Sequence, residues 1–195
     1  MVNIDKQIEE IIVSSFPEEF SEEINHIFQY LKWNKLTYSD LFERIIIEEQ
    51  IINIPYRIYF DELKHVNISN LSKLEYRILC CLFTRHSNGK VREKYLRDIL
   101  NQDSLYTWEI PYVLQLTGEY VVEIIELILM KWELLDNENL YKFICSNRKY
   151  VEKTIRRIQS YWNAYYRGYA QENEYVGFII KESLQSSLIN KISSV

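Results

Sequence analysis

Apolar residues recur every three to four positions along most of the chain, which is the spacing of one face of an α-helix. Phe20, Ile24, Ile27, Phe28 and Leu31 keep this spacing without a gap. The pattern predicts about eight helices joined by short polar loops. The clearest of them cover residues 4–12, 20–31, 72–82, 91–100, 108–116, 121–132, 148–166 and 175–192.

Three further segments are considered beside these eight. A helix is expected from Thr37, since Thr is a good N-cap and Asp40 follows three residues later. Residues 51–60 form either a short helix or an extended segment, because Pro55 breaks any helix before it. A short helix is expected near Tyr141. The predicted buried face of the helix from Thr37 consists of Leu41, Phe42, Ile45 and Ile46.

Two local patterns predict helix ends. Ser72 followed by Glu75 is a capping box, in which each side chain bonds the backbone N–H of the other residue. Asn88-Gly89 is expected to stop the preceding helix, since both residues readily adopt a positive φ.

The fold class follows from these helices and from the scarcity of turn residues. Only four Gly and three Pro are present, too few for a sandwich or barrel of this length. We therefore predict one all-α domain over residues 1–195, an irregular multi-helix bundle. The alternative is a short stack of helical hairpins, because Ile54-Pro55-Tyr56 is echoed by Ile110-Pro111-Tyr112. Ordinary helix-start chemistry explains that echo equally well.

Charge is distributed unevenly. Residues 1–70 hold six Lys and Arg against thirteen Asp and Glu, whereas residues 71–195 hold seventeen against fifteen. The N-terminal part therefore presents an acidic surface, which suits a basic partner. The remainder is mixed.

A basic stripe is predicted on the helix over residues 148–166. Val151, Ile155, Ile158, Trp162 and Tyr165 define its buried side at about 100° per residue. Five cations fall on the opposite, exposed side as candidate binding residues: Lys149, Lys153, Arg156, Arg157 and Arg167. Nucleic acid is a possible ligand, but Trp162 and Tyr165 are expected in the core and the pI of about 5.4 is low for that function.

A second candidate binding site is the turn over residues 84–90. Arg85, His86 and Lys90 lie close together there and are able to contact an anionic group. A plain turn with a basic residue near the helix end is the simpler interpretation. Arg92 falls among apolar residues, so we expect it to pair with an acid from another helix.

The sequence contains the residue types of a di-iron carboxylate site, but the direction of its histidines argues against one. Such bundles use Glu-x-x-His pairs and lone glutamates that all project inward. The matching residues here are Glu23 with His26, Glu62 with His65, and the lone acids Glu9 and Glu43. His26 lies about 145° from the apolar stripe of its helix, so it is expected to point into water. No metal-binding residue is therefore predicted.

Known catalytic patterns are absent from the sequence. There is no nucleophile elbow, Walker loop, His-Glu-x-x-His motif or dinucleotide fingerprint. Cys80 and Cys81 lie in an apolar run and are expected to be buried, far in sequence from Cys145. No catalytic or cofactor-binding residue is predicted, although an enzyme with an unfamiliar site stays an open alternative.

The sequence also predicts a compartment. Residues 1–6 lack the features of a signal peptide, and the most apolar stretch, 121–130, is interrupted by Glu123 and Glu126. That stretch is also shorter than the roughly 20 residues needed to span a bilayer. Three cysteines without a disulfide or zinc spacing favour a reducing compartment. We expect a cytoplasmic protein with no membrane association.

These observations lead to two main hypotheses for function. The first is a non-enzymatic protein-binding module, in its most specific form an inhibitor or immunity-type protein for a basic partner. Its basis is the acidic N-terminal surface and the sixteen Tyr, a residue common at interfaces. The second is a nucleic-acid-associated helical protein that uses the basic stripe. Oligomeric state is left open by the sequence.

Overall fold

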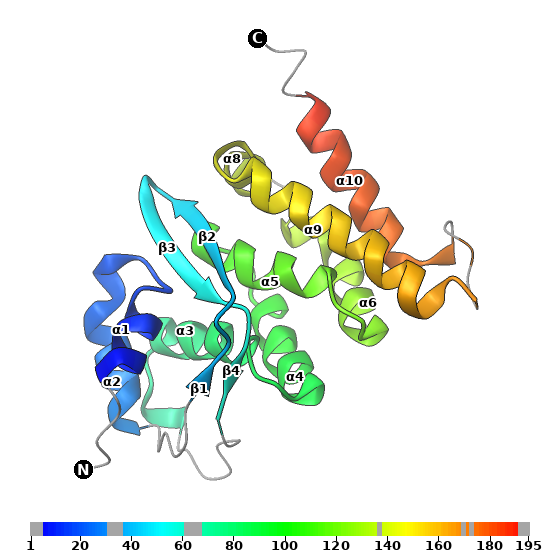
Figure 1. Ribbon diagram of the computed structural model, residues 1–195. Helices are drawn as coiled ribbons and strands as arrows, with labels where there is room; N and C mark the ends of the chain where they lie inside the picture. Colours follow the sequence, from blue (N-terminus) through cyan, green and yellow to red (C-terminus); the bar gives the residue numbers. More distant parts are fainter. Residues whose placement is uncertain are drawn as a thin grey trace. The chain divides into compact units, whose positions relative to one another are not determined.

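The computed structural model describes residues 6–30, 37–60, 68–135, 138–168, 171 and 174–190. Within these residues the chain is mostly helical, with ten α-helices and four short strands (Figure 1). The prediction of a helical protein is confirmed in this coarser form, whereas the strands and the additional helices correct the all-α, eight-helix description. The chain divides into two compact units, residues 1–99 and 100–195.

The first unit combines helices with two small antiparallel sheets. Strand β1 pairs with β4, and β2 pairs with β3. Helix α2 packs on α1 and α3, and α1 also contacts β3. Its elements are α1 (Lys6–Val13), the 3-10 helix η1 (Glu18–Phe20), α2 (Ser21–Tyr30), β1 (Thr37–Tyr38), β2 (Phe42–Ile47), β3 (Gln50–Pro55), β4 (Ile58–Tyr59), the 3-10 helix η2 (Ile68–Asn70), α3 (Lys73–Phe83) and α4 (Gly89–Leu100), whose last residue belongs to the second unit.

The β2–β3 hairpin replaces the helix predicted from Thr37. Alternate residues of β2 are buried, and these are Glu43, Ile45 and Ile47. Phe42 and Ile46, which the prediction buried, are 37% and 41% exposed, and Leu41 is 67% exposed. The Ile45-Ile46-Ile47 run fits either a strand or a helix, and β-branched residues favour the strand. The extended alternative for residues 51–60 is the one that the structure adopts.

Helix ends agree with the sequence at one site and differ at the other. Ser72 and Glu75 form the predicted capping box at the start of α3. Helix α3 ends at Phe83, and Asn88 instead serves the next helix, because its side-chain oxygen accepts the N–H of Lys90. None of the described glycines has a positive φ, so the predicted stop at Gly89 is wrong.

Aromatic side chains form the core where α3 meets α4. The ring of Phe83 lies 4.8 Å from that of Phe60 and 4.2 Å from that of Tyr95. His86 stacks parallel to Phe83, and its Nε2 donates to the carbonyl of Phe60. Phe83 is completely buried. Through this cluster, the end of α3 packs against the segment that follows β4.

In the second unit, the secondary structure of the described residues is helical, with turns and loops between the helices. Helix α10 packs against α9 and α6, and α5 contacts α6 and α9. Buried polar groups reinforce this packing; for example, the hydroxyl of Tyr150 donates to the carbonyl of Pro111 at 2.8 Å. Its elements are the 3-10 helix η3 (Thr107–Glu109), α5 (Ile110–Thr117), α6 (Val122–Met130), α7 (Trp132–Leu135), α8 (Glu138–Ser146), α9 (Arg148–Tyr161), the π-helix η4 (Trp162–Tyr166) and α10 (Val176–Asn190).

The π-helix continues α9 and changes its phase. The N–H of Arg167 donates to the carbonyl of Trp162, five residues earlier, at 2.9 Å. Each residue in such a turn rotates less than the 100° of an α-helix, so side chains beyond Tyr161 shift around the axis. The helix predicted over residues 148–166 is thus present, with a wider last turn.

Candidate functional site

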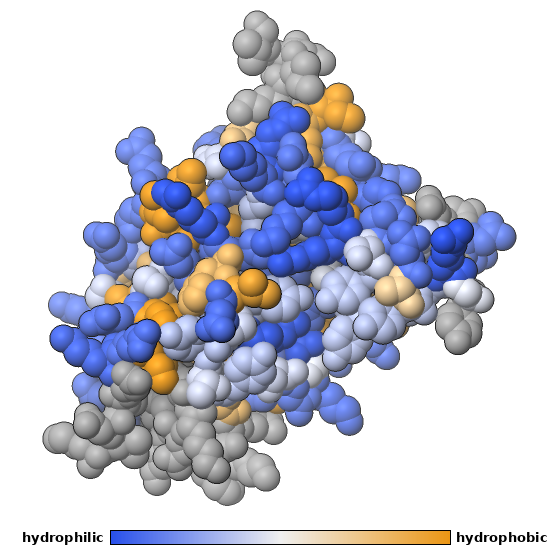
Figure 2. All heavy atoms as spheres, in the orientation of Figure 1, coloured by the Kyte–Doolittle hydropathy of each residue, from blue (hydrophilic) through white to orange (hydrophobic). Residues whose placement is uncertain are grey.

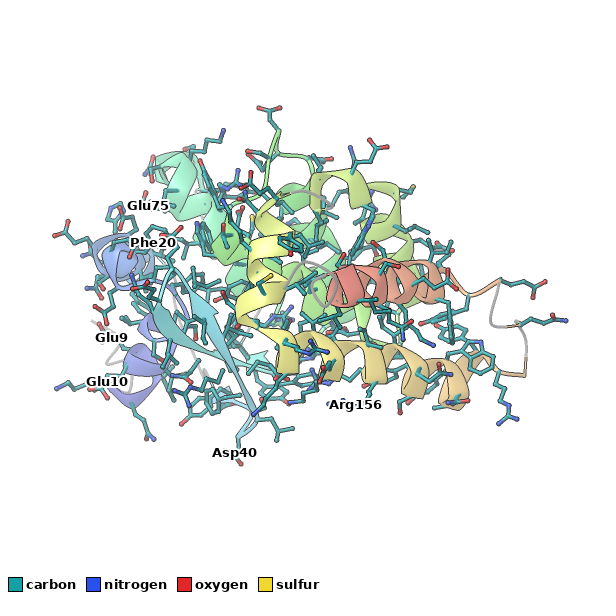
Figure 3. All side chains as sticks on the ribbon, turned by 90° about the horizontal axis from the view of Figure 1, so that it is seen from above. Glu9, Glu10, Phe20, Asp40, Glu75 and Arg156 are labelled. Atoms are coloured by element: carbon teal, nitrogen blue, oxygen red, sulfur yellow. The ribbon has the colours of Figure 1, made fainter. Side chains whose placement is uncertain are left out.

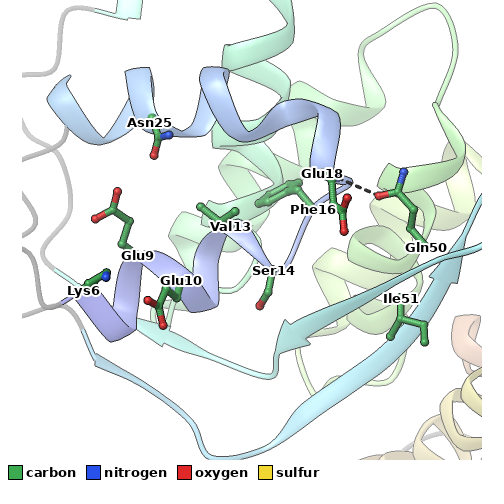
Figure 4. A pocket seen from close by; sticks show the side chains of 10 residues that line it. All are labelled: Lys6, Glu9, Glu10, Val13, Ser14, Phe16, Glu18, Asn25, Gln50 and Ile51. Atoms are coloured by element: carbon green, nitrogen blue, oxygen red, sulfur yellow. Dashed lines mark hydrogen bonds between the residues drawn. The ribbon is translucent and has the colours of Figure 1, made fainter.

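A cleft of about 500 Å³ opens in the first unit between α1, η1, α2 and the beginning of β3. That volume is within the range of ligand-binding pockets. Figure 4 shows Glu9 pointing from α1 toward Asn25 of α2, with Gln50 and Ile51 on the hairpin side. We call this site the acidic cleft; its lining residues are Lys6, Glu9, Glu10, Val13, Ser14, Phe16, Glu18, Asn25, Gln50 and Ile51.

Gln50 fixes the geometry of the acidic cleft. Its side-chain oxygen accepts the N–H of Glu18 at 2.9 Å, and its amide donates to the carboxylate of Glu19 at 3.0 Å. On the other side, Asn53 of β3 donates its N–H to the carbonyl of Ser14 at 2.8 Å. These bonds hold the hairpin against the segment that joins α1 to α2. The walls of the cleft are therefore positioned before any ligand binds.

The acidic cleft has an apolar floor and an acidic rim. Phe16 is 2% exposed and lies at the bottom, while Val13 is half-buried and Ile51 is 49% exposed. Glu10 and Glu18 are exposed, and residues 1–30 carry seven Asp and Glu against a single Lys. The site can therefore accept a positive charge together with apolar surface. The sequence predicted the acidic surface, but not this cleft.

Two more glutamates form the tip of the hairpin, next to the acidic cleft. Glu48 and Glu49 have φ values of 47° and 72°, and they are the described non-glycine residues with positive φ. A two-residue hairpin turn requires this conformation and is normally made by Asn-Gly. A side chain with a Cβ is disfavoured there by roughly 1–2 kcal/mol per residue. Retained local strain of this kind is common where side chains serve a function.

Replacing this turn is expected to stabilise the protein. Glu48→Asn with Glu49→Gly should raise the free energy of unfolding by about 1–2 kcal/mol, because both new residues tolerate a positive φ. Urea denaturation followed by circular dichroism measures the change. The control is Glu48→Gln with Glu49→Gln, which removes both charges and keeps the backbone cost. Equal stabilisation by the two double variants would mean that charge repulsion, not backbone conformation, is responsible.

The basic stripe of the second unit is where the sequence predicted it. Lys149, Lys153, Arg156 and Arg167 are exposed, whereas Val151 and Ile158 on the other side of α9 are buried. Arg157 is half-buried, and its stem lies against Gly118, where an added Cβ would come within 2.9 Å. Figure 3 shows Arg156 on the side of α9 turned away from α10. The predicted stripe is therefore available on the surface, with Arg157 at its edge.

Three tyrosines form a cluster where α9 ends and η4 begins. Tyr161 and Tyr165 stack with ring centroids 5.8 Å apart, and Tyr120 lies 5.9 Å from Tyr165 and 6.4 Å from Tyr161. Tyr165 is 55% exposed, so the prediction that it lies in the core is wrong. The reason is the π-helical turn, which shifts Tyr165 outward while Trp162 stays buried. Tyr120 comes from the segment after α5 and joins Tyr161 and Tyr165 only in the tertiary structure.

Two further tyrosines, Tyr166 and Tyr175, lie next to this cluster. The hydroxyl of Tyr166 donates to the carbonyl of Tyr120, and its ring stacks on Tyr175 at 5.0 Å. Burial raises the pKa of Tyr166, and the nearby carboxylate of Glu123 raises it further. Tyr175 is almost completely buried, which raises its pKa strongly. Both side chains therefore stay neutral and act as structural supports.

The turn over residues 84–90 does not present its three candidate binding residues together on the surface. Arg85 is fully buried and His86 is 5% exposed, so neither side chain is placed to meet a partner at the surface. The carbonyl of Arg85 accepts the N–H of Ile58, and Nδ1 of His86 accepts the N–H of Asn88. Of the three candidates, Lys90 alone is exposed. The turn joins β4 to the helices and has a structural role.

Arg92 also has a role in this turn. It is 1% exposed, and its Nη1 donates to the carbonyls of His86 and Ser87 at 2.9 and 2.8 Å. The sequence predicted a buried arginine paired with an acid. These two bonds go to main-chain oxygens that lie beyond the end of α3.

His26 does not point freely into water as predicted. Its Nδ1 bonds the carboxylate of Glu75, and its side chain is 40% exposed. Burial acts to raise the pKa of Glu75, but the N–H of Ser72 and the His26 side chain outweigh burial and lower it. In the part of the chain that is described, no three His, Cys, Asp or Glu side chains gather as metal ligands, and Glu62 and His65 lie outside that part.

Comparison with known proteins gave no match: no family model fits the chain, and no curated protein or solved structure is significantly similar to it. Cys80 and Cys81 are buried, as the apolar run predicted. Among the described helices, none is long and apolar enough to cross a membrane. Function must therefore be inferred from the surfaces themselves.

Proposed function

We propose that this chain is a non-enzymatic binding module whose acidic cleft holds a basic segment of a partner protein. The observation that carries the proposal is the combination of an apolar floor with an acidic rim in one preformed cleft. A Lys or Arg side chain has an apolar stem and a charged head, so it matches both parts. The stem covers Phe16, Val13 and Ile51, and the head reaches the carboxylates of the rim.

The glutamates around the acidic cleft support recognition of positive charge. Glu9 and Glu10 come from α1, Glu18 follows the turn after it, and Glu48 and Glu49 lie at the hairpin tip. Acidic groups collected on one surface attract a basic partner over distance and raise the rate of association. A turn that keeps two unfavourable glutamates instead of Asn-Gly fits such a role.

The most specific form of the proposal is an inhibitor or immunity-type protein that neutralises a basic toxin or enzyme in the cytoplasm. In that form the cleft receives one or two anchor side chains of the partner, and the surrounding acids supply the electrostatic rim.

Charge reversal in the acidic cleft tests the proposal. Random peptides displayed on phage are selected on the immobilised full chain, and the best binders are synthesised and measured by fluorescence anisotropy. The expected peptides contain Lys or Arg next to apolar residues. Glu9→Lys with Glu10→Lys should weaken their binding by at least about tenfold, because attraction becomes repulsion at the rim.

The matched control carries the same change of charge outside the cleft. Glu126→Lys with Glu133→Lys alters two exposed glutamates of the second unit, neither of which lines the acidic cleft. This variant should retain binding within about twofold once salt reaches 150 mM, because neither side chain lines the cleft and long-range attraction is screened. Selection of neutral or acidic peptides, or an equal loss in both double variants, would contradict the proposal.

A further inference from the structure

Positive charge in the second unit is concentrated on one segment. Residues 100–195 carry ten Lys and Arg and twelve Asp and Glu. Residues 148–167 hold six of those cations and one of those acids, and that acid, Glu152, pairs with Arg148 at 2.9 Å. The remainder of the unit is strongly acidic, so the segment is a local site for anions on a chain that is acidic overall.

The cations of this segment lie on its outer face. Lys149, Lys153 and Arg156 are spaced four and three residues apart, so they share one side of α9, and all three are exposed. The opposite side is buried against the rest of the unit through Val151 and Ile158. In the space-filling view, strongly hydrophilic side chains cover the course of α9 (Figure 2).

Exposed aromatic side chains follow this charge along the chain, where α9 passes into η4. Tyr120 and Tyr165 are 49% and 55% exposed, and together with Tyr161 they form the stacked cluster described above. Exposed tyrosines held in place by one another offer flat faces at low cost in side-chain entropy. Arg167 lies just beyond them, so the aromatic faces have cations on either side along the chain.

We propose that this face, formed by Lys149, Lys153, Arg156, Tyr161, Tyr165 and Tyr120, binds single-stranded nucleic acid. Phosphates contact the cations of α9, and unpaired bases stack on the exposed tyrosine rings. Backbone-tracking cations combined with aromatic platforms are the general means of holding a single strand without sequence preference. The carboxylates of Glu123 and Glu126 on α6 act electrostatically on Tyr166. They mark the edge of the site on the side of α6.

Single strands fit this face better than other anions. In a duplex the bases are stacked on one another, so the tyrosine rings cannot reach the flat faces of the bases. An acidic peptide satisfies the cations but leaves the rings uncovered. The π-helical turn is central here, because a continuous α-helix would place Tyr165 toward the core.

Binding is tested with the full chain and fluorescein-labelled 20-nucleotide oligo(dT) and oligo(U), with a duplex of equal length as comparison, by fluorescence anisotropy in 50 mM salt. We expect the single strands to bind more tightly than the duplex. Tyr165→Ala should weaken binding by about tenfold, the loss of one stacked base, whereas Tyr165→Phe should retain it. Arg156→Gln should lower the salt dependence by about 0.7 in the slope of log K against log salt.

Tyr106→Ala is the matched control, since Tyr106 is 50% exposed in the same unit and stacks on Trp108. It should bind as the unsubstituted chain does. Absence of binding in 50 mM salt, equal affinity for the duplex, equal loss in Tyr106→Ala and Tyr165→Ala, or displacement by polyglutamate as effective as by unlabelled oligo(dT) would each overturn the proposal. Circular dichroism of every variant confirms that it is folded.

Discussion

Phe83→Ala is expected to lower the free energy of unfolding by about 3–5 kcal/mol, the range for removing a buried aromatic ring. Phe83 is completely buried and is in contact with the rings of Phe60 and Tyr95. Its removal leaves a cavity where α3 ends, and the flanking rings have few ways to close it. Urea denaturation followed by far-ultraviolet circular dichroism measures the loss.

The control is Leu41→Ala, which removes an apolar side chain that is 67% exposed and should cost less than about 0.5 kcal/mol. A loss below about 1.5 kcal/mol for Phe83→Ala would contradict the described core.

Urea denaturation of Phe83→Ala also tests the predicted single domain. In a Trp33→Phe background the remaining Trp residues, 108, 132 and 162, belong to residues 100–195. One cooperative domain requires their fluorescence transition to shift together with the circular dichroism.

Arg92→Met is expected to destabilise the protein by about 3 kcal/mol. The guanidinium of Arg92 donates to the carbonyls of His86 and Ser87, and the side chain is 1% exposed. Methionine replaces most of the volume but none of the donors. Two main-chain oxygens then lose charge-assisted hydrogen bonds, each contributing about 1.5–3 kcal/mol.

Arg97→Met on the same helix is the matched control. Arg97 forms an exposed ion pair with Glu93 four residues earlier, at 2.9 Å. Such surface pairs contribute about 0.3–0.5 kcal/mol, so this variant should unfold close to the unsubstituted chain. If the two methionine variants were equally stable, the carbonyl contacts of Arg92 would carry no net stabilisation. Thermal denaturation at one pH and ionic strength allows a direct comparison.

Local sequence patterns predicted the helices well where one face is clearly apolar. In α9, Val151 and Ile158 are buried and Lys153 and Arg156 are exposed, as the 100° projection indicated. The capping box of Ser72 and Glu75 is also present. Both features depend on residues within about one helical turn of one another, so the local sequence is enough to predict them.

The hairpin was the main error of the sequence-based fold. Ile45, Ile46 and Ile47 satisfy a helical period and a strand period alike, and Glu48-Glu49 lacks the usual chemistry of a two-residue turn. The strand is selected by its pairing with residues 50–55 and by the bonds of Asn53 to the segment after α1. The local hints of extended structure were Pro55 and a glutamate pair between two isoleucine runs.

The candidate sites were predictable in charge but not in shape. The acidic N-terminal part and the basic stripe follow from residue counts and helical projection. The acidic cleft requires Gln50 to bond Glu18 and Glu19, contacts that span more than thirty residues. The exposed tyrosine cluster requires a π-helical turn and the approach of Tyr120 to Tyr161 and Tyr165.

The sequence by itself determined that the protein is mostly helical, which faces of its helices are buried, and where charge of each sign collects. Those properties follow from the periodicity of side chains along a single helix. The tertiary structure decided which residues form the hairpin, the cleft and the tyrosine cluster, and it placed Arg85 and His86 in the interior. These outcomes depend on hydrogen bonds and packing between segments far apart in the chain, which compete with local preference and exceed it.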